Sequence, residues 1–150
     1  MSSSFLVVIP KVPNADIPKT APDVKALLSK MAGTDEARIK NYGKVQFIDC
    51  GEAFEFVACP NCETQLSVEQ WHTLMYQDWH SEDGFHLHEH AMPCCAVVHT
   101  LDALRYVAPQ GFSKWLISAR AHNRGPLTGP ELKQLEDVAG MRLRAIIQQY

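Results

Sequence analysis

The chain has 150 residues, of which 46% are hydrophobic and 21% are charged, and its formal net charge is −3. This length fits one domain, residues 1–150, and the apolar content argues against intrinsic disorder. The small negative charge argues against a nucleic-acid-binding domain, because most such domains are basic. No apolar run approaches the ~18 residues that a transmembrane helix needs.

The N-terminus and the cysteines indicate the compartment. The first residues lack the basic segment and the long apolar stretch of a secretory signal peptide, so we expect a cytoplasmic protein that does not enter a membrane. Because thiols stay reduced there, the five cysteines indicate metal binding or burial rather than disulfides. An odd count fits four ligands and one spare residue, Cys50.

The first part of the chain predicts a strand, a helix and a second strand. Residues 5–9 are a short apolar run that a proline stops, as in a buried strand. A helix is expected between Thr20, which can cap its start, and Gly33, which can end it. Residues 44–50 alternate in the manner of a strand.

The middle of the chain carries two cysteine pairs. A strand at residues 54–58 leads into the sequence Cys-Pro-Asn-Cys at residues 59–62, and a strand at residues 96–99 follows the pair at residues 94–95. Thiolates are the usual ligands of structural zinc, which prefers four of them in a tetrahedron. We therefore predict that one structural Zn²⁺ is bound by Cys59, Cys62, Cys94 and Cys95.

The membership of this ligand set stays open in one respect. Neighbouring residues of a straight strand point to opposite faces, so Cys94 and Cys95 can share an ion only if the backbone turns between them. Otherwise His90 or His99 replaces one of the two. After Cys62, zinc knuckles usually have a glycine that eases a left-handed backbone step, and this chain has Glu63.

A helix is expected to begin at Ser67, with Gln70 completing a capping box. That start is too late to activate Cys59 as a redox thiol, since in thioredoxin-like dithiols the helix begins at the Cys-Pro-x-Cys motif. Four apolar residues recur at helical spacing and are expected to pack the helix against the rest of the protein: Val68, Trp71, Met75 and Trp79.

Three histidines alternate in the segment 86–90, which we expect to be a strand. His86, His88 and His90 then lie on one side, either as solvated side chains, as ligands of a second metal ion that could activate water, or with one of them in the zinc site. The surrounding segment 63–93 contains six acidic residues and no Lys or Arg. The middle is therefore acidic and rich in histidine.

The last part of the chain repeats the order of the first. Residues 112–121 predict a strand, although the apolar run at 115–117 would also suit a helix. A helix is expected from Thr128 to Gly140, and residues 141–147 alternate as a final strand. Two strand–helix–strand units predict an α+β fold with a split βαβ (ferredoxin-like) sheet, into which residues 51–110 are inserted as a zinc-ribbon-like segment.

Several motifs follow one another in a characteristic order. Cys-Pro-x-Cys is followed by an excursion of 31 residues that contains Trp71, by Pro93-Cys94-Cys95, and by the segments 101–106 and 140–146. This combination resembles a family of small uncharacterised bacterial proteins that contain a zinc ribbon. The resemblance implies a zinc site and a bacterial source, and it implies no activity.

The sequence offers no clear catalytic constellation. It contains no phosphate-binding loop, nucleophile elbow or nucleotide fingerprint. We therefore expect a non-enzymatic, zinc-stabilised protein-binding module, an adaptor or immunity-type protein, whose acidic insertion contacts the partner. The alternatives are a nucleic-acid-binding zinc ribbon, which would need basic residues around the knuckles, and a metal-dependent hydrolase that uses His86, His88 and His90.

Overall fold

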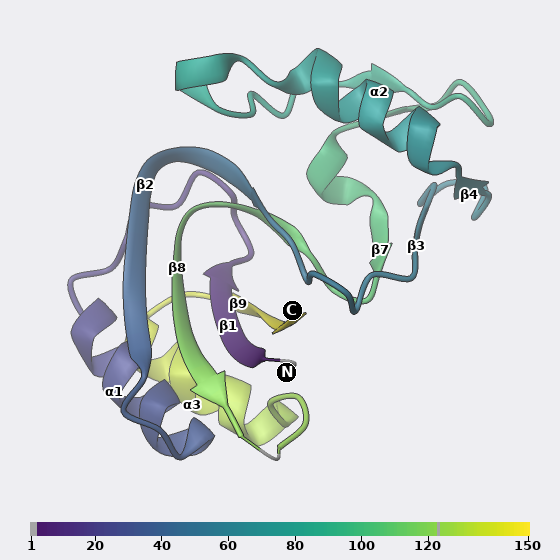
Figure 1. Cartoon of the computed structure of the whole chain (residues 1–150). Coiled ribbons are helices and arrows are strands. Elements are labelled where there is room, and N and C mark those ends of the chain that lie inside the picture. Colours follow the sequence, from purple (N-terminus) through teal and green to yellow (C-terminus); the bar gives the residue numbers. More distant parts are fainter. Residues whose placement is uncertain (1–2, 123) are drawn as a thin grey trace.

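The computed structural model describes residues 3–122 and 124–150. Within these residues the chain is α+β, with three α-helices and with antiparallel sheets of four, three and two strands (Figure 1). The longest of these helices has 12 residues, and none of them is long and apolar enough to cross a membrane.

The four-stranded sheet is built from the two ends of the chain. Its strands are β1 (Ser4–Pro10), β2 (Ala37–Ile48), β8 (Gly111–Ala121) and β9 (Leu143–Gln149), in the order β2-β8-β1-β9. Neighbouring strands are antiparallel. Helices α1 (Ala21–Ala32) and α3 (Gly129–Ala139) lie next to each other on one face of this sheet (Figure 1).

The helix boundaries follow the predicted capping residues. Thr128 and Glu131 form a complete capping box at the start of α3. Gly33 and Gly140 end α1 and α3 with φ of 71° and 72°, a left-handed conformation that costs glycine little. The strand–helix–strand order at each end of the chain is as predicted.

The apolar run at residues 115–117 is a strand because both of its faces are buried. Trp115 and Ile117 face the core under α1 and α3, with Leu28 and Leu135. Leu116 points to the other face, where it joins a second cluster of buried side chains that includes Cys50. A strand buried on both faces has a continuous apolar sequence rather than an alternating one.

Strand β2 is longer than predicted, since it begins at Ala37 instead of residue 44. Its register against β8 shifts between Asn41 and Gln46, and Gly43 within this interval has a φ of 73°. Asn41 accepts a hydrogen bond from the Gly43 amide. The irregularity breaks the alternation of side chains, which hid the first half of the strand from sequence analysis.

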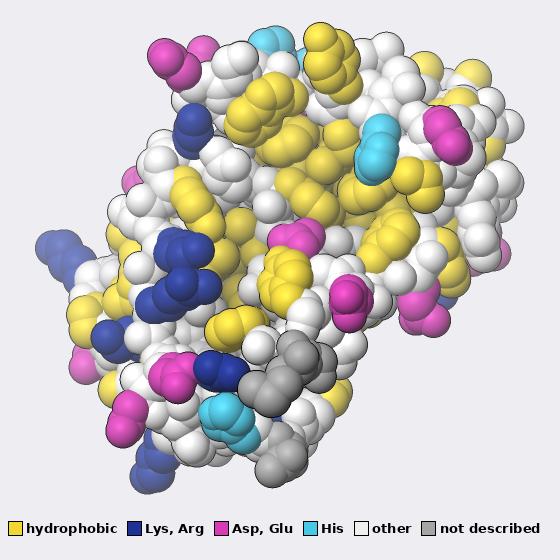
Figure 2. Space-filling view, viewed as in Figure 1, with side chains coloured by type: hydrophobic (Ala, Val, Ile, Leu, Met, Phe, Trp, Pro, Cys, Tyr) yellow, Lys and Arg dark blue, Asp and Glu magenta, His cyan; other side chains and the backbone are white. Residues whose placement is uncertain are grey.

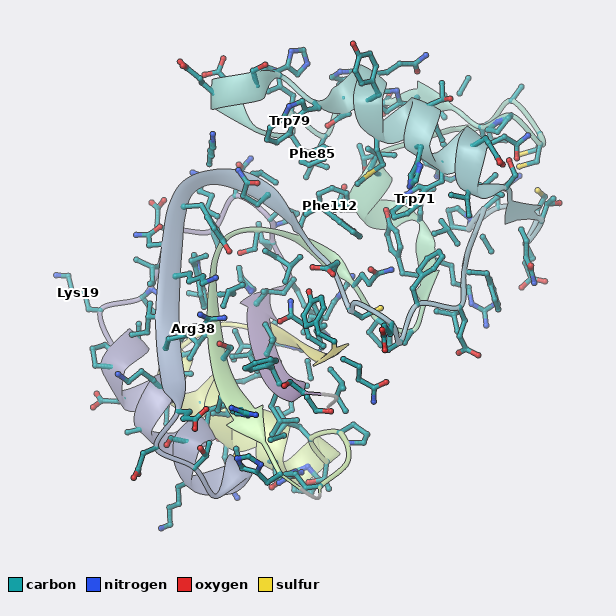
Figure 3. The ribbon with its side chains drawn as sticks, in the orientation of Figure 1. Lys19, Arg38, Trp71, Trp79, Phe85 and Phe112 are labelled. Carbon is teal, nitrogen blue, oxygen red and sulfur yellow. The ribbon has the colours of Figure 1, made fainter. Side chains whose placement is uncertain are left out.

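The segment between β2 and β8 consists of short elements. They are β3 (Phe56–Ala58), β4 (Gln65–Leu66), α2 (Val68–Asp78), η1 (Ser81–Asp83), β5 (His90–Ala91), β6 (Val98–His99), η2 (Leu101–Ala103) and β7 (Arg105–Val107). They form the sheets β4-β3-β7 and β5-β6. Because β2 and β8 curve toward this segment, Val45 and Phe112 pack into its core beside Trp71 (Figures 1 and 3).

Candidate metal centre

The first cysteine pair lies in a tight turn directly after β3. The amide of Glu63 donates a hydrogen bond to the carbonyl of Cys59 over 3.0 Å, and the amide of Cys59 donates to the carbonyl of Thr64 over 2.9 Å. Glu63 itself makes the left-handed step, with a φ of 64°. A residue with a Cβ atom pays roughly 1–2 kcal/mol for this conformation, and glycine avoids that cost.

The second cysteine pair lies in a turn of the same construction. The amide of Ala96 donates to the carbonyl of Met92 over 2.9 Å, and Ala96 has a φ of 63°. Buried Met92 stands where the first turn has Cys59. The backbone therefore turns through Cys94 and Cys95, which is the condition for adjacent cysteines to face one ion.

The four cysteines come together as predicted. The sulfur atoms of Cys59 and Cys95 are 3.7 Å apart, and those of Cys62 and Cys94 are 3.4 Å apart. All four sulfurs lie within 4.8 Å of one another. Sulfur atoms around a tetrahedral Zn²⁺ are about 3.8 Å apart, given Zn–S bonds of about 2.3 Å. The cluster could thus hold a metal ion, and it includes neither His90 nor His99.

The cluster joins the core of the inserted segment to its surface. Cys59 is fully buried in that core, Cys95 is half-buried, and Cys62 and Cys94 are exposed. The side-chain amide of Asn61 is 3.7 Å from the sulfur of Cys95. An ion bound here would connect the end of β3 to the turn before β6.

The thiols differ in acidity. Hydrogen bonds with Thr64 and with the neighbouring thiol of Cys94 lower the pKa of Cys62 to about 6. Loss of solvation, together with hydrogen bonds to the neighbouring thiols, raises the pKa of Cys94 to about 12. Four thiolates repel one another at these distances, and a divalent cation among them removes that repulsion.

A second cluster lies at the C-terminal end of α2. The Asp78 carboxylate is fully buried and accepts hydrogen bonds from the amides of Leu87 over 2.7 Å and of His88 over 3.1 Å. Its Oδ1 atom is 2.8 Å from Nε2 of His90 and 3.5 Å from Nε2 of His88. Burial raises the pKa of Asp78, but the hydrogen bonds from His90 and Leu87 and the nearby imidazoles outweigh it, so the pKa is lowered.

The predicted strand at residues 86–90 is therefore wrong for most of its length. Only His90 belongs to a strand, β5, and Leu87 has a φ of 55°. The two amides that would pair with a neighbouring strand donate to Asp78 instead. As a result His88 and His90 both lie close to Asp78. The ring of His86 instead stacks on that of His80, with the two ring centroids 3.7 Å apart.

Sequence analysis missed Asp78, although a signal was present. The residue lies seven positions after Trp71 and four after Leu74, so it shares the buried face of α2 with both. A carboxylate on the apolar face of an amphipathic helix needs buried donors. The other acidic residues of the segment 63–93 are exposed, and in the sequence Asp78 is distinguished from them only by its position on the helix.

The outer surface of α2 carries apolar side chains. Trp71 is buried and Met75 is partly buried, whereas Val68 is 50% exposed, Tyr76 82% and Trp79 38%. The predicted packing role therefore applies to Trp71 and Met75 and also to Trp79, whose ring centroid is 5.0 Å from that of Phe85, but not to Val68. We call Val68, Tyr76 and Trp79 the outer stripe. Figure 2 shows hydrophobic side chains gathered beside α2, with Lys and Arg lying mainly over the sheet.

Comparisons with known proteins give no match, whether to a protein-family model, to a curated protein or to a solved structure. The resemblance to bacterial zinc-ribbon proteins therefore stays a hypothesis. Functional inference for this chain rests on the geometry of the two clusters and of α2.

Proposed function

We propose that the chain is a non-enzymatic protein-binding module in which a structural Zn²⁺ stabilises the inserted segment and α2 presents the binding surface. The observation that carries the proposal is the outer stripe, three exposed apolar side chains on α2 and at its C-cap, behind which buried and partly buried aromatic residues pack. In this proposal the fold is a split βαβ (ferredoxin-like) sheet with a zinc-ribbon-like insertion. The strand order β2-β8-β1-β9 and the two knuckle turns support it.

The identity of the ion follows from the donor set. Four thiolates at tetrahedral separations favour zinc, and four protein ligands leave no coordination position for a substrate or a reactive water. The proposed role is thus structural. The proposal includes a reducing compartment such as the cytoplasm, because oxidised cysteines do not bind the ion.

The outer stripe is supported from behind by a row of aromatic rings. From Trp79 the row runs through Phe85, Phe112 and Phe47 to Trp71, with successive ring centroids 5.0, 5.1, 5.2 and 5.5 Å apart (Figure 3). Aromatic side chains held in one position lose little entropy on binding and are frequent anchors of interfaces.

The charges around the stripe indicate the chemistry of the partner. The segment that carries the stripe, residues 63–93, contains no Lys or Arg, and its exposed acidic residues include Glu69, Glu82, Asp83 and Glu89. One cation from outside the segment lies against the stripe, since Nζ of Lys44 is 5.9 Å from the ring centroid of Trp79. Such a surface attracts a protein with an apolar site rimmed by Lys or Arg and repels the phosphates of nucleic acid. We therefore propose a basic protein partner for this face.

Site-specific crosslinking tests the proposal. A photo-crosslinking phenylalanine analogue replaces Tyr76 in cells that produce the protein, and in the control it replaces Lys133, which is 71% exposed on α3. We expect one protein to be captured from position 76 and not from position 133. With that protein purified, Trp79→Ala should weaken binding by about thirtyfold, corresponding to about 2 kcal/mol.

The matched control is Val12→Ala, which removes an apolar side chain that is 64% exposed but lies outside the inserted segment. It should leave the affinity unchanged. Equal capture from both positions, capture of a second copy of the chain alone, or an unchanged affinity in Trp79→Ala would each overturn the proposed binding surface.

A further inference from the structure

The second cluster has the composition and geometry of a metal site in its own right. We infer that Asp78, His88 and His90 bind a divalent transition-metal ion, separate from the ion of the four cysteines. Oδ1 of Asp78 lies 2.8 Å from Nε2 of His90 and 3.5 Å from Nε2 of His88, and one ligand atom from each of the three residues lies within 4.8 Å of the others. One carboxylate and two imidazoles are a ligand set for Zn²⁺, Fe²⁺ and Co²⁺.

The backbone preorganises this ligand set. Asp78 is the last residue of α2, and the amides of Leu87 and His88 fix both of its carboxylate oxygens. Those two hydrogen bonds are the outer-shell contacts that orient a ligating carboxylate. The same contacts turn the chain at Leu87, so that the imidazoles of His88 and His90 both approach Oδ1.

Metal binding requires only a small rearrangement of protons. Nε2 of His90 lies 2.8 Å from Oδ1 of Asp78, and because a carboxylate only accepts, this contact is a hydrogen bond in which Nε2 carries the proton. The tautomer with its proton on Nδ1 directs the Nε2 lone pair at the same oxygen. An ion between the two atoms then replaces the hydrogen bond. Metal–ligand bonds of about 2.0–2.2 Å in a tetrahedron place neighbouring ligand atoms about 3.4 Å apart, so the two atoms separate by only about 0.6 Å from their present 2.8 Å.

The site is open on one side. Asp78 and His90 form a buried floor, with side chains 0% and 7% exposed, whereas His88 is 48% exposed and lies at the surface. An ion can therefore reach the cluster from solvent, and it keeps at least one coordination position for water. Glu89 is exposed next to His88 and His90 in the sequence, and residues 63–93 contribute no Lys or Arg that would oppose binding.

The inferred ligand set differs from the three histidines that the sequence offers as one alternative for a second metal site. His86 is outside the ligand set and stacks on His80 instead. The two histidines form a matched pair for mutation, since His86 and His88 lie two residues apart in the same loop. Adventitious binding by surface imidazoles would depend on both, whereas the inferred site depends on His88 alone.

Cobalt titration of protein loaded with a single equivalent of zinc tests the inference, because excess zinc would fill both sites. Zinc occupies the cysteine cluster, so added Co²⁺ should give the weak d–d absorption of nitrogen and oxygen ligands without the intense sulfur-to-cobalt charge-transfer band. Equilibrium dialysis should find one Co²⁺ per chain. His88→Gln should weaken Co²⁺ binding by more than about 100-fold, since loss of an outer-shell contact alone costs 10–100-fold, and His86→Gln should leave it unchanged.

Asp78→Asn should also weaken Co²⁺ binding, and a thermal melt reports whether that variant is folded. Because His88 is exposed, His88→Gln should fold like the parent, so the comparison of His88→Gln with His86→Gln does not depend on folding. The inference is overturned if the zinc-loaded protein binds no Co²⁺, if His88→Gln binds as tightly as the parent, or if His86→Gln loses as much affinity as His88→Gln. The protein-binding surface on α2 is not affected by any of these outcomes.

Discussion

The four strands of the sheet have between seven and twelve residues, whereas the strands of the inserted segment have two or three. The sheet is held by long hydrogen-bonded ladders and by an aliphatic core under α1 and α3. The insertion has few ladder hydrogen bonds, and its core combines aliphatic and sulfur-containing side chains with six aromatic ones. Polar cross-links replace the missing ladders.

Two of these cross-links connect parts of the insertion that are far apart in sequence. The cysteine cluster joins the turn at residues 59–62 to that at residues 92–96, and Asp78 joins the end of α2 to the loop at residues 86–90. A loop-rich segment of this size buries too little apolar surface to be ordered by packing alone. The fold of the insertion therefore depends on a few specific groups, whereas the stability of the sheet is distributed over many backbone hydrogen bonds and apolar contacts.

The largest effect is expected from Cys59→Ser, because this change removes the buried thiol of the cysteine cluster that is proposed to bind zinc. Structural zinc contributes on the order of 10–16 kcal/mol in small peptides, which exceeds what a short-stranded segment can supply otherwise. Metal analysis should show loss of the ion. Hydrogen exchange should show loss of amide protection in α2 and β3 but retained protection in β1 and β8.

Cys50→Ala is the matched control, since Cys50 is equally buried but packs against the sheet. It should keep the metal and cost only about 1 kcal/mol through the smaller side chain. A Cys59→Ser protein with an unchanged metal content and a protected α2 would contradict the structural role of the cluster. Loss of protection in β1 would show that the two regions unfold together.

Much of the sheet and of the cysteine cluster could be predicted because their signals are local. Caps at Thr128 and Gly140 mark a helix within a few residues, and Cys-Pro-x-Cys fixes its own turn. The convergence of Cys94 and Cys95 could be stated only as a condition, since it depends on a left-handed step at Ala96. No sequence rule assigns that step to alanine.

The second cluster could not be predicted because it depends on contacts distant in sequence. The alternation of histidines indicates a strand only if their amides pair with another strand. Here a carboxylate nine and ten residues earlier accepts those hydrogen bonds. The resulting turn at Leu87 keeps His88 and His90 together and separates them from His86.

The next effect in size is expected from Trp71→Ala, which removes the ring on which the insertion core is centred. Trp71 stacks on Phe54 with an interplanar angle of 13° and meets Phe47 and Tyr106 edge-on. Loss of a buried aromatic ring costs about 3–5 kcal/mol. Hydrogen exchange should place this loss in the insertion, whereas Leu135→Ala should destabilise the sheet and its helices.

Trp71→Phe is the control, because it keeps an aromatic ring at this position. It should recover more than half of the stability that Trp71→Ala loses. If Trp71→Ala instead lowers protection equally in β1 and in α2, the insertion is not a separate unit of unfolding. The distinction between the two regions would then concern their local geometry and not their stability.

A smaller effect is expected from Asp78→Ala. The change leaves the amides of Leu87 and His88 without their buried acceptor, and an unsatisfied buried donor costs about 1–3 kcal/mol. We expect a loss of about 3 kcal/mol in urea unfolding without added transition metal, with faster hydrogen exchange at Leu87 and His88. Zinc in the cysteine cluster should be retained. A stability equal to that of the parent would show that the carboxylate is not a cross-link.

The smallest effect concerns an ion pair on the sheet side. The Arg124 guanidinium donates two hydrogen bonds to the Glu131 carboxylate over 2.7 and 2.9 Å, and with the Thr128 amide it lowers the pKa of Glu131 from 4.5 to about 2. A carboxyl whose pKa is lower in the folded state stabilises the fold above its unfolded pKa. This contribution is lost as the pH falls from about 4.5 to about 2. Because both side chains are nearly one quarter exposed, we expect the ion pair to contribute only about 1 kcal/mol to the free energy of unfolding.

Glu131→Gln should lower the protection of β8 amides near neutral pH, and the difference from the parent should vanish toward pH 2. Measuring β8 separates this effect from acid loss of the metal, which acts on the insertion. A difference that stays constant with pH would mean that Glu131 acts through the capping box and not through its charge.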